Sequence, residues 1–256
     1  MTTKPLIIAI SIEKGGNTRT TTTVNLSYAL ASKNYKVGII DFDMQKNASL
    51  NLQTTGGSDL ATCLKTVSIK LEDFSQTQNN NLFILKNNSD IAEDLFNQFQ
   101  VDDRTYVLKD SLDDLTGLDF VFIDTPPSLQ LQANNALVAC DYVLAPCTLE
   151  PFAINGLQNL LSAINRLKVR TAPNIKLLGV IISKFSEVYS NNDLMVGSIT
   201  SILGGDNLIF KSRIRQNISI PKSQTNKQSI YEYNDKKGVE DFNTLADEFL
   251  QKINYK

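Results

Sequence analysis

Residues 5–21 read PLIIAISIEKGGNTRTT, which joins an apolar run to a glycine-containing loop and a threonine-rich segment. The run at 5–12 is rich in β-branched side chains, which is typical of a buried central strand in a parallel sheet. The segment at 20–33 carries apolar residues at helical spacing. The loop between them therefore leaves the carboxyl edge of a sheet and leads into the start of a helix.

A loop in this position favours an anion as ligand, because its backbone N–H groups and the positive end of the helix dipole converge there. Gly15 and Gly16 let the backbone curl closely around phosphate, and Thr20 offers a hydroxyl where such loops place a Mg²⁺ ligand. Two glycines alone would more often mark a tight turn. Their place between a strand and a helix favours a phosphate-binding loop, in which Arg19 occupies the usual lysine position.

Length and composition fit a single intracellular enzyme domain spanning residues 1–256. The formal net charge of −2 argues against a protein that is basic all over, but it allows a local basic patch. Cys63, Cys140 and Cys147 have no metal-ligand spacing, so we expect reduced, buried thiols.

The chain contains no histidine, which excludes imidazole catalysis and histidine metal ligation. The sequence shows no signal-peptide pattern and no apolar run long enough to span a bilayer. We therefore expect a cytoplasmic protein.

Strand-like and helix-like segments alternate, which predicts an α/β fold with a doubly wound, mostly parallel sheet and helices on both faces. Strands are expected at 5–12, 36–41, 82–86, 119–124, 141–146 and 176–183. Helices are expected at 20–33, 89–99, 104–115, 129–139, 153–168, 192–203 and 238–254. The polar stretch at 75–81 is expected to form a surface loop.

Two acidic residues follow predicted strands. Asp43 lies just beyond the strand at 36–41, and Asp124 ends the strand at 119–124. Either could be a loop or helix-cap residue. A carboxylate at such a strand end also serves as a metal-binding acid in phosphate-loop NTPases, and Asp43 could orient a water or hold metal.

Taken together, these motifs resemble the ParA/MinD family of phosphate-loop ATPases with a deviant Walker A loop, most strongly the small, Soj-like ParA-type partition proteins. The matching segments are the loop at 14–21, DFDMQKNAS at 41–49, IDTPPS at 123–128, NALVACD at 135–141 and EPFAING at 150–156. The resemblance continues into the C-terminal region, so it covers nearly the whole chain. It implies a phosphate-loop NTPase fold and an ATPase that uses ATP and Mg²⁺.

The resemblance also implies roles for individual residues. Lys14 would reach across a sandwich dimer to the partner subunit's phosphates, and Arg19 would contact the β- and γ-phosphates. Thr20 and Asp124 would serve Mg²⁺, while Asp43 would support hydrolysis and could contact the metal. Nucleotide binding is expected from Lys14, Gly15, Gly16, Asn17, Thr18, Arg19, Thr20 and Thr21.

Two residues depart from the family's loop. Arg19 carries a broad, planar guanidinium group where the family has the compact ammonium group of a lysine. Thr18 replaces a glycine, which adds a Cβ where close approach or unusual backbone dihedrals are needed. We expect ATP to bind and its hydrolysis to be slow, because a misplacement of about 1 Å can cost ~10²-fold in rate.

By the same resemblance, the ATP-bound dimer would bind DNA non-specifically and a ParB-like, centromere-binding partner would stimulate hydrolysis. The candidate DNA-binding residues are Lys184, Lys211, Arg213, Arg215, Lys222 and Lys227. A solvated, charged loop is an equally good interpretation of this cluster. Because the chain begins at the first strand, we expect no N-terminal helix-turn-helix domain.

Other functions within the fold remain open. A MinD-like positioning ATPase would end in a basic amphipathic helix on a membrane, but the segment at 239–256 is acidic until its last residues. We therefore expect this segment to pack on the domain and the protein not to bind a membrane. A nucleotide-gated binding protein without turnover is a further alternative. Metabolic enzymes of the fold are disfavoured, because Lys14 indicates the sandwich-dimer branch.

Overall fold

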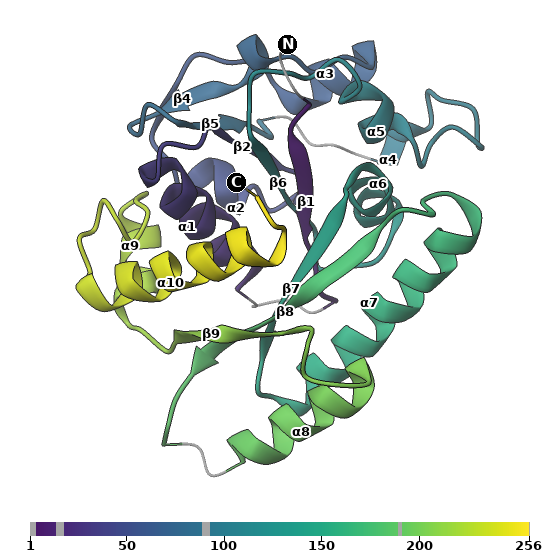
Figure 1. Cartoon of the computed structure of the whole chain (residues 1–256). Helices are drawn as coiled ribbons and strands as arrows, with labels where there is room; N and C mark the ends of the chain where they lie inside the picture. Colours follow the sequence, from purple (N-terminus) through teal and green to yellow (C-terminus); the bar gives the residue numbers. More distant parts are fainter. Residues whose placement is uncertain (1–3, 14–17, 89–92, 189–190, 256) are drawn as a thin grey trace.

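The computed structural model describes residues 4–13, 18–88, 93–188 and 191–255, which form an α/β structure around one sheet (Figure 1). The strands are β1 (Leu6–Ile10), β2 (Val37–Asp41), β3 (Thr54–Thr55), β4 (Ser75–Thr77), β5 (Leu82–Leu85), β6 (Phe120–Asp124), β7 (Tyr142–Thr148), β8 (Lys176–Phe185) and β9 (Ile209–Arg215). The helices are α1 (Arg19–Ser32), α2 (Asn47–Leu50), α3 (Leu60–Thr66), the 3-10 turn η1 (Leu71–Asp73), α4 (Glu93–Phe96), α5 (Val107–Ser111), α6 (Leu131–Ala139), α7 (Pro151–Arg170), α8 (Asn192–Leu203), α9 (Ser219–Thr225) and α10 (Lys236–Lys252).

The sheet has the strand order β3-β4-β5-β2-β6-β1-β7-β8-β9. From β5 to β9 all neighbouring strands are parallel, whereas β3 and β4 add an antiparallel edge. The predicted doubly wound, mostly parallel sheet is confirmed. The first strand lies between β6 and β7, in the middle of the sheet, so the loop that follows it starts at the centre of the carboxyl edge.

Both faces of the sheet are buried, as the apolar sequences of its central strands predict. In β6, Phe120 and Phe122 pack into a core that also contains Leu30 of α1 and Phe249 of α10. The alternate residues Val121 and Ile123 of β6 pack into a second core together with residues of α3 and α5.

Most predicted elements are present with small shifts at their ends. All six expected strands form, and the helix expected at 192–203 has the same bounds as α8. The helix expected at 104–115 is limited to α5, and of the helix expected at 89–99 the described residues contain α4; residues 89–92 lie outside the described part.

The expectation of a surface loop at 75–81 is wrong for its first half. Ser75 and Thr77 belong to β4 and are buried, and β4 pairs antiparallel with β5. Their hydroxyls find internal acceptors: Ser75 Oγ donates to Gly56 O at 2.7 Å and Thr77 Oγ1 to Leu82 O at 2.8 Å. Polar residues can therefore form a buried strand here, because the hydrogen bonds offset their desolvation.

Strand β9 lies where the sequence predicts only a basic patch. Its residues alternate strictly between the two sides: Phe210, Ser212 and Ile214 are buried, whereas Lys211 and Arg213 are exposed. This two-residue period is that of a half-buried strand. The short elements α2, β3, α3 and α9 were also not expected, since few residues specify them.

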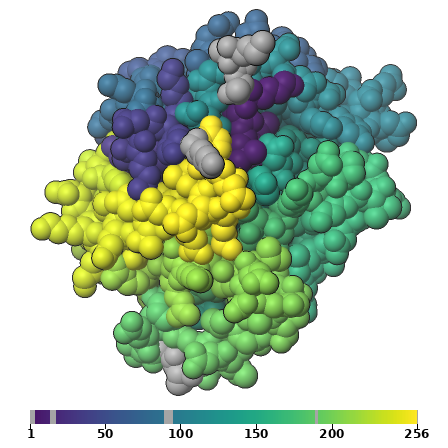
Figure 2. Space-filling view, viewed as in Figure 1, coloured from purple at the N-terminus to yellow at the C-terminus, as the bar shows by residue number. Residues whose placement is uncertain are grey.

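Helix α10 packs on the domain, as expected from its amphipathic sequence. Phe242, Leu245 and Phe249 are fully buried in the same core as residues of α1. Figure 1 shows α10 between α1 and β9, and Figure 2 shows its outer side as part of the molecular surface. The three cysteines are buried, and none of them forms a disulfide within the described residues. Among the described helices, none is both long and apolar enough to cross a membrane.

Candidate functional site

The carboxyl ends of β2 and β6 bring two buried aspartates together. Asp41, the last residue of β2, lies in register with Asp124, the last residue of β6. Burial disfavours the ionised form of a carboxyl group, so it raises the pKa of Asp124, and the charge of Asp41 raises it further. Burial likewise raises the pKa of Asp41. This edge of the sheet therefore holds acidic groups that a cation would stabilise in their charged form.

Thr20 brings the start of α1 to these carboxylates. Thr20 Oγ1 donates a hydrogen bond to Asp124 Oδ2 at 2.7 Å, and Thr23 Oγ1 donates to Asp124 Oδ1 at 3.2 Å. In the described part of the chain, no cluster of three or more Cys, Asp or Glu residues could hold a metal ion. A metal at this site would depend on hydroxyl and carboxylate oxygens together with ligand phosphates, which is how Mg²⁺ is usually bound.

Arg19, the first residue of α1, directs its side chain into the protein. Its Nε donates to Thr125 O at 3.0 Å and its Nη1 donates to Ile12 O at 2.9 Å. Only 5% of Arg19 is exposed, and burial lowers the pKa of its guanidinium, while the charges of Asp124 and Asp43 oppose that effect. The guanidinium thus bridges the segments that follow β1 and β6.

Thr18 occupies the N-cap position of α1 with φ −76° and ψ 19°. These dihedrals are accessible to any L-residue, so the described conformation requires no glycine at this position. The Thr18 side chain makes no capping hydrogen bond, and within the described residues its buried Oγ1 has no hydrogen-bond partner.

Asp43 lies two residues beyond β2, at the start of a turn. Its Oδ1 accepts a hydrogen bond from Gln45 N at 3.0 Å, and its backbone carbonyl accepts one from Asn87 Nδ2 at 3.1 Å. Asp41 Oδ2 accepts from Ser49 N at 2.7 Å, which ties the far end of the same loop to the sheet. The loop at 41–49 is therefore fixed at both ends, and it places the nearly buried Asp43 close enough to Arg19 for their charges to interact.

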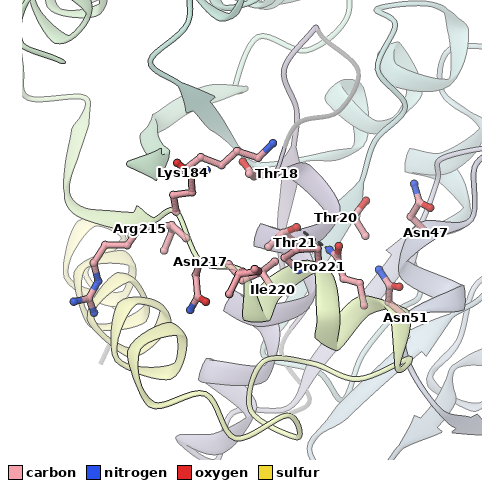
Figure 3. A pocket seen from close by; sticks show the side chains of 14 residues that line it. Thr18, Thr20, Thr21, Asn47, Asn51, Lys184, Arg215, Asn217, Ile220 and Pro221 are labelled. Atoms are coloured by element: carbon pink, nitrogen blue, oxygen red, sulfur yellow. Dashed lines mark hydrogen bonds between the residues drawn. The ribbon is translucent and has the colours of Figure 1, made fainter. Parts of the chain in front are cut away.

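A cavity of about 940 Å³ lies at the N-terminus of α1. Thr18, Thr20 and Thr21 form part of its wall, α2 and the residue after it contribute Asn47 and Asn51, and the segment after β9 lies on another side (Figure 3). Its remaining lining residues are Lys184, Ile214, Arg215, Gln216, Asn217, Ile218, Ile220, Pro221 and Gln224. A cavity of this size, with a helix N-terminus and hydroxyl groups at its wall, can hold a phosphorylated small molecule.

The predicted loop residues Lys14, Gly15, Gly16 and Asn17 lie outside the described residues. The residue before them, Glu13, is fixed against α7. A Cβ added to Gly156 would lie 2.2 Å from Glu13 O, and Asn159 Nδ2 donates a hydrogen bond to the Glu13 carboxylate. The glycine in the EPFAING segment therefore allows α7 to approach the start of the loop.

The six candidate DNA-binding residues do not form one equivalent group. Arg215 is ion-paired: its Nη2 lies 2.7 Å from Glu240 Oε2, and its Nε donates to Asp241 Oδ1 at 2.8 Å. Its backbone N also donates to Asp241 Oδ2 at 2.9 Å. These hydrogen bonds raise the pKa of Arg215. The charge of Arg215 is thus largely balanced by two carboxylates of α10, although its side chain is 44% exposed.

The other five candidates are exposed as well. Lys211 and Arg213 project from β9, and the Arg213 guanidinium lies over the Phe185 ring at 4.5 Å. Lys222 and Lys227 lie in and after α9, whereas Lys184 lines the cavity. Lys184 therefore lies at the cavity, whereas Lys211, Arg213, Lys222 and Lys227 lie on the outer surface.

Sequence reasoning missed several residues that build the site. The sequence predicts no role for Asp41, although it lies in register with Asp124 on the neighbouring strand. Gln224 was not singled out, yet its Nε2 donates to Thr21 Oγ1 at 2.9 Å and links α9 to the start of α1. The last residue of an apolar strand is a usable signal for Asp41; no signal exists for Gln224, which lies 203 positions from its partner.

Comparison with known proteins matches residues 6–177 to the AAA domain family AAA_31. The chromosome partitioning protein ParA of Caulobacter vibrioides is 28% identical over 230 residues, which cover 87% of this chain and 85% of that protein. A Cyanothece McdA variant in complex with ATP has a TM-score of 0.81 at 20% identity and covers 99% of this chain and 98% of its own. Cobyrinic acid a,c-diamide synthase of Mycobacterium smegmatis, with bound ADP and magnesium, has a TM-score of 0.78 at 22% identity, with coverages of 98% and 96%.

At these identities the two solved structures establish the fold alone, and that fold serves proteins with different names and ligands. The family model covers more than half of the chain and includes β1, Thr20, Asp43 and Asp124. The chain therefore belongs to this AAA domain family, that of the ParA/MinD ATPases.

Proposed function

We propose that the protein is a ParA-type partition ATPase that binds ATP with Mg²⁺, dimerises around the nucleotide and binds DNA non-specifically. The observation that carries this proposal is the Thr20–Asp124 hydrogen bond at the N-terminus of α1, beside a cavity of about 940 Å³. A hydroxyl, a buried carboxylate and a helix N-terminus at one place match the needs of a Mg²⁺–phosphate group.

The residues present fit this ligand. Thr20 would hold the metal through its hydroxyl, and Asp124 would orient that hydroxyl and supply negative charge behind it. Thr18 and Thr21 line the cavity beside Thr20. Mg²⁺, when bound, would neutralise phosphate charge during phosphoryl transfer.

Hydrolysis is proposed to depend on Asp43, whose carboxylate would orient an attacking water, and on Lys14 from the partner subunit. We expect slow turnover, because Arg19 directs its guanidinium toward Ile12 O and Thr125 O. The double substitution Thr18→Gly with Arg19→Lys should raise the ATPase rate. An unchanged rate would show that these two residues do not limit turnover.

Non-specific DNA binding is proposed for the exposed basic residues Lys211, Arg213, Lys222 and Lys227. Such binding acts on phosphates and depends on salt, so loss of one phosphate contact should reduce the salt slope of binding by about one unit. A ParB-like partner bound to a plasmid, a chromosome or another cargo would stimulate hydrolysis, and the protein would associate with the nucleoid. The similarity to a chromosome partitioning protein supports this scheme.

The proposal is tested by measuring DNA binding with ATP, with ADP and without nucleotide, together with ATP hydrolysis on the same sample. The expected result is binding that requires ATP and a dimer that forms only with ATP. DNA binding that is indifferent to nucleotide would contradict the partition function.

A nucleotide-gated binding protein without turnover is the second candidate, and the inward direction of Arg19 favours it. It predicts ATP-dependent dimerisation with an ATPase rate of zero, even when partner and DNA are present. A MinD-like membrane function finds less support, since the apolar side of α10 is already buried on the domain.

A further inference from the structure

We propose that a second basic surface, at the amino edge of the sheet, contacts the phosphates of double-stranded DNA. This amino-edge surface consists of Arg166, Lys168 and Arg170 at the end of α7 and Lys176 at the start of β8. The inference rests on the proposed function in one respect, because it takes DNA as the polyanion. It goes beyond that function, which places the DNA contacts on β9 and α9.

The distribution of charge along the chain singles out this region. Residues 151–186 contain five Lys or Arg residues and no Asp or Glu, although the whole chain has 27 acidic residues and a formal net charge of −2. Four of these five cations form the amino-edge surface, and the fifth, Lys184, lines the cavity. A local excess of positive charge in an otherwise acidic chain favours a polyanion as ligand.

The side chains of the amino-edge surface are available for a ligand. All four residues are exposed, and in the part of the chain that the structure describes their side chains form no hydrogen bond and no ion pair. An acid, Asp141, lies next to Lys176, whose backbone N donates to Asp141 O at 3.2 Å. The carboxylate of Asp141 accepts a hydrogen bond from Ile7 N at 2.9 Å, so it already has a partner.

The stability of α7 does not account for this set of cations. Lys168 and Arg170 lie in the last turn, where the helix dipole favours positive charge. Arg166 lies before that turn and four positions from Arg170, and like charges at this spacing destabilise a helix. Lys176 belongs to a strand. The dipole therefore explains two of the four residues, whereas a bound polyanion would neutralise all four.

The amino-edge surface is separate from the cavity. Helix α7 begins beside the loop, where Gly156 approaches Glu13 O, and its 20 residues extend over about 30 Å. Figure 1 shows α7 on the flank opposite to α9, and Figure 2 shows its outer side as part of the molecular surface. Contacts made here would thus add to those proposed for Lys211 and Arg213.

DNA suits this surface better than a membrane does. Arg166 and Arg170 carry planar guanidinium groups, which bind phosphate oxygens through paired N–H groups. A helix that lies on lipid also needs a broad apolar face. Within residues 166–176, the one exposed large apolar side chain is that of Val169.

The test measures the salt dependence of DNA binding in the presence of ATP. The double variant Arg166→Gln with Arg170→Gln should lower the slope of log affinity against log salt by about two units, since each lost phosphate contact removes about one. Arg166→Lys with Arg170→Lys should keep the slope, because it keeps the charge. Lys36→Gln with Lys65→Gln is the matched control: it removes the same charge at exposed residues before β2 and in α3, so its slope should equal that of the wild type.

A further variant and the melting temperature separate binding from folding. Lys176→Gln, which changes β8 and leaves α7 intact, should lower the slope by about one unit. The melting temperature of every variant should stay within about 2 °C of the wild type, because only exposed side chains are changed.

An unchanged slope in the double glutamine variant of Arg166 and Arg170, or an equal loss in the lysine control, would overturn the amino-edge surface. Binding of the wild type to phosphatidylserine vesicles that this variant loses, with an unchanged DNA slope, would also overturn it, since the partner would then be a membrane. If the wild type binds no DNA with ATP, the proposed function fails as well. If the wild type binds DNA and the variant keeps its slope, the amino-edge surface alone fails.

Discussion

Substitution of Arg215 by alanine tests whether this residue holds the fold together or contacts DNA. Arg215 links the end of β9 to α10 through Asp241 and Glu240. The side chain of Asp241 is 8% exposed and that of Arg215 is 44% exposed. Removing one partner of a fully buried pair costs ~3–5 kcal/mol, whereas an exposed pair contributes ~0.2–1 kcal/mol. This half-buried pair lies between these limits, so we expect a loss of about 2 kcal/mol in the free energy of unfolding.

For a chain of this size, a loss of that order lowers the melting temperature by about 4–8 °C. The assay combines thermal unfolding with DNA binding in the presence of ATP on the same samples, and Arg213→Ala serves as the control. Arg213 projects from the same strand and stacks on Phe185, so its loss should affect stability less and DNA affinity more. The salt slope of DNA binding should fall by about one unit for Arg213→Ala only.

The opposite pattern would refute this reasoning. If Arg215→Ala melts within about 1 °C of the wild type and loses DNA affinity as Arg213→Ala does, the ion pair contributes little and Arg215 is a DNA contact. The two arginines would then act as the one basic patch that the sequence predicted.

Three further predictions concern the cavity and its supports. Thr20→Val should weaken ATP binding in Mg²⁺ but not in excess EDTA, as measured by calorimetry, and equal losses in both would contradict a metal role. Gly156→Ala places a Cβ 2.2 Å from Glu13 O; it should lower the free energy of unfolding by about 1–3 kcal/mol and weaken nucleotide binding, whereas wild-type values would show that α7 does not fix the loop. Asp235 caps α10 by accepting from the backbone N–H of Gly238 at 2.7 Å, which lowers its pKa. Asp235→Asn keeps an acceptor oxygen but removes the negative charge at the helix N-terminus, so it should cost about 0.3–1 kcal/mol at neutral pH. The difference in melting temperature should shrink as pH falls below about 4 and through the lowered pKa; a constant difference would contradict the role of the charge.

The order of elements and the position of the site could be predicted from the sequence, because both depend on local patterns. The apolar run at 5–12, the glycine-containing loop and the two acidic strand ends each carry their signal within a few residues. A parallel sheet then necessarily collects its strand ends at one edge, which is why Thr20 and Asp124 meet although 104 positions separate them.

The parts that could not be predicted depend on contacts between distant segments. The direction of the Arg19 side chain is set by the carbonyl groups of Ile12 and Thr125, and no local pattern reports their positions. The segment after β9 forms one wall of the cavity, and this wall likewise depends on a contact between distant segments. Gln224 and Thr21, which join it to α1, are 203 positions apart in the sequence.

The contacts between α10 and β9 explain why the C-terminal helix is acidic. This strand is at the edge of the sheet, where unpaired N–H groups would invite pairing with another chain. Glu248 accepts hydrogen bonds from the backbone N–H groups of Lys211 and Ser212 at 2.8 and 2.7 Å, and Asp241 accepts one from that of Arg215 at 2.9 Å. The carboxylates of α10 therefore act as backbone acceptors along an edge strand. The same acidic residues close this edge of the sheet and leave the side chains of Lys211 and Arg213 on the outer surface.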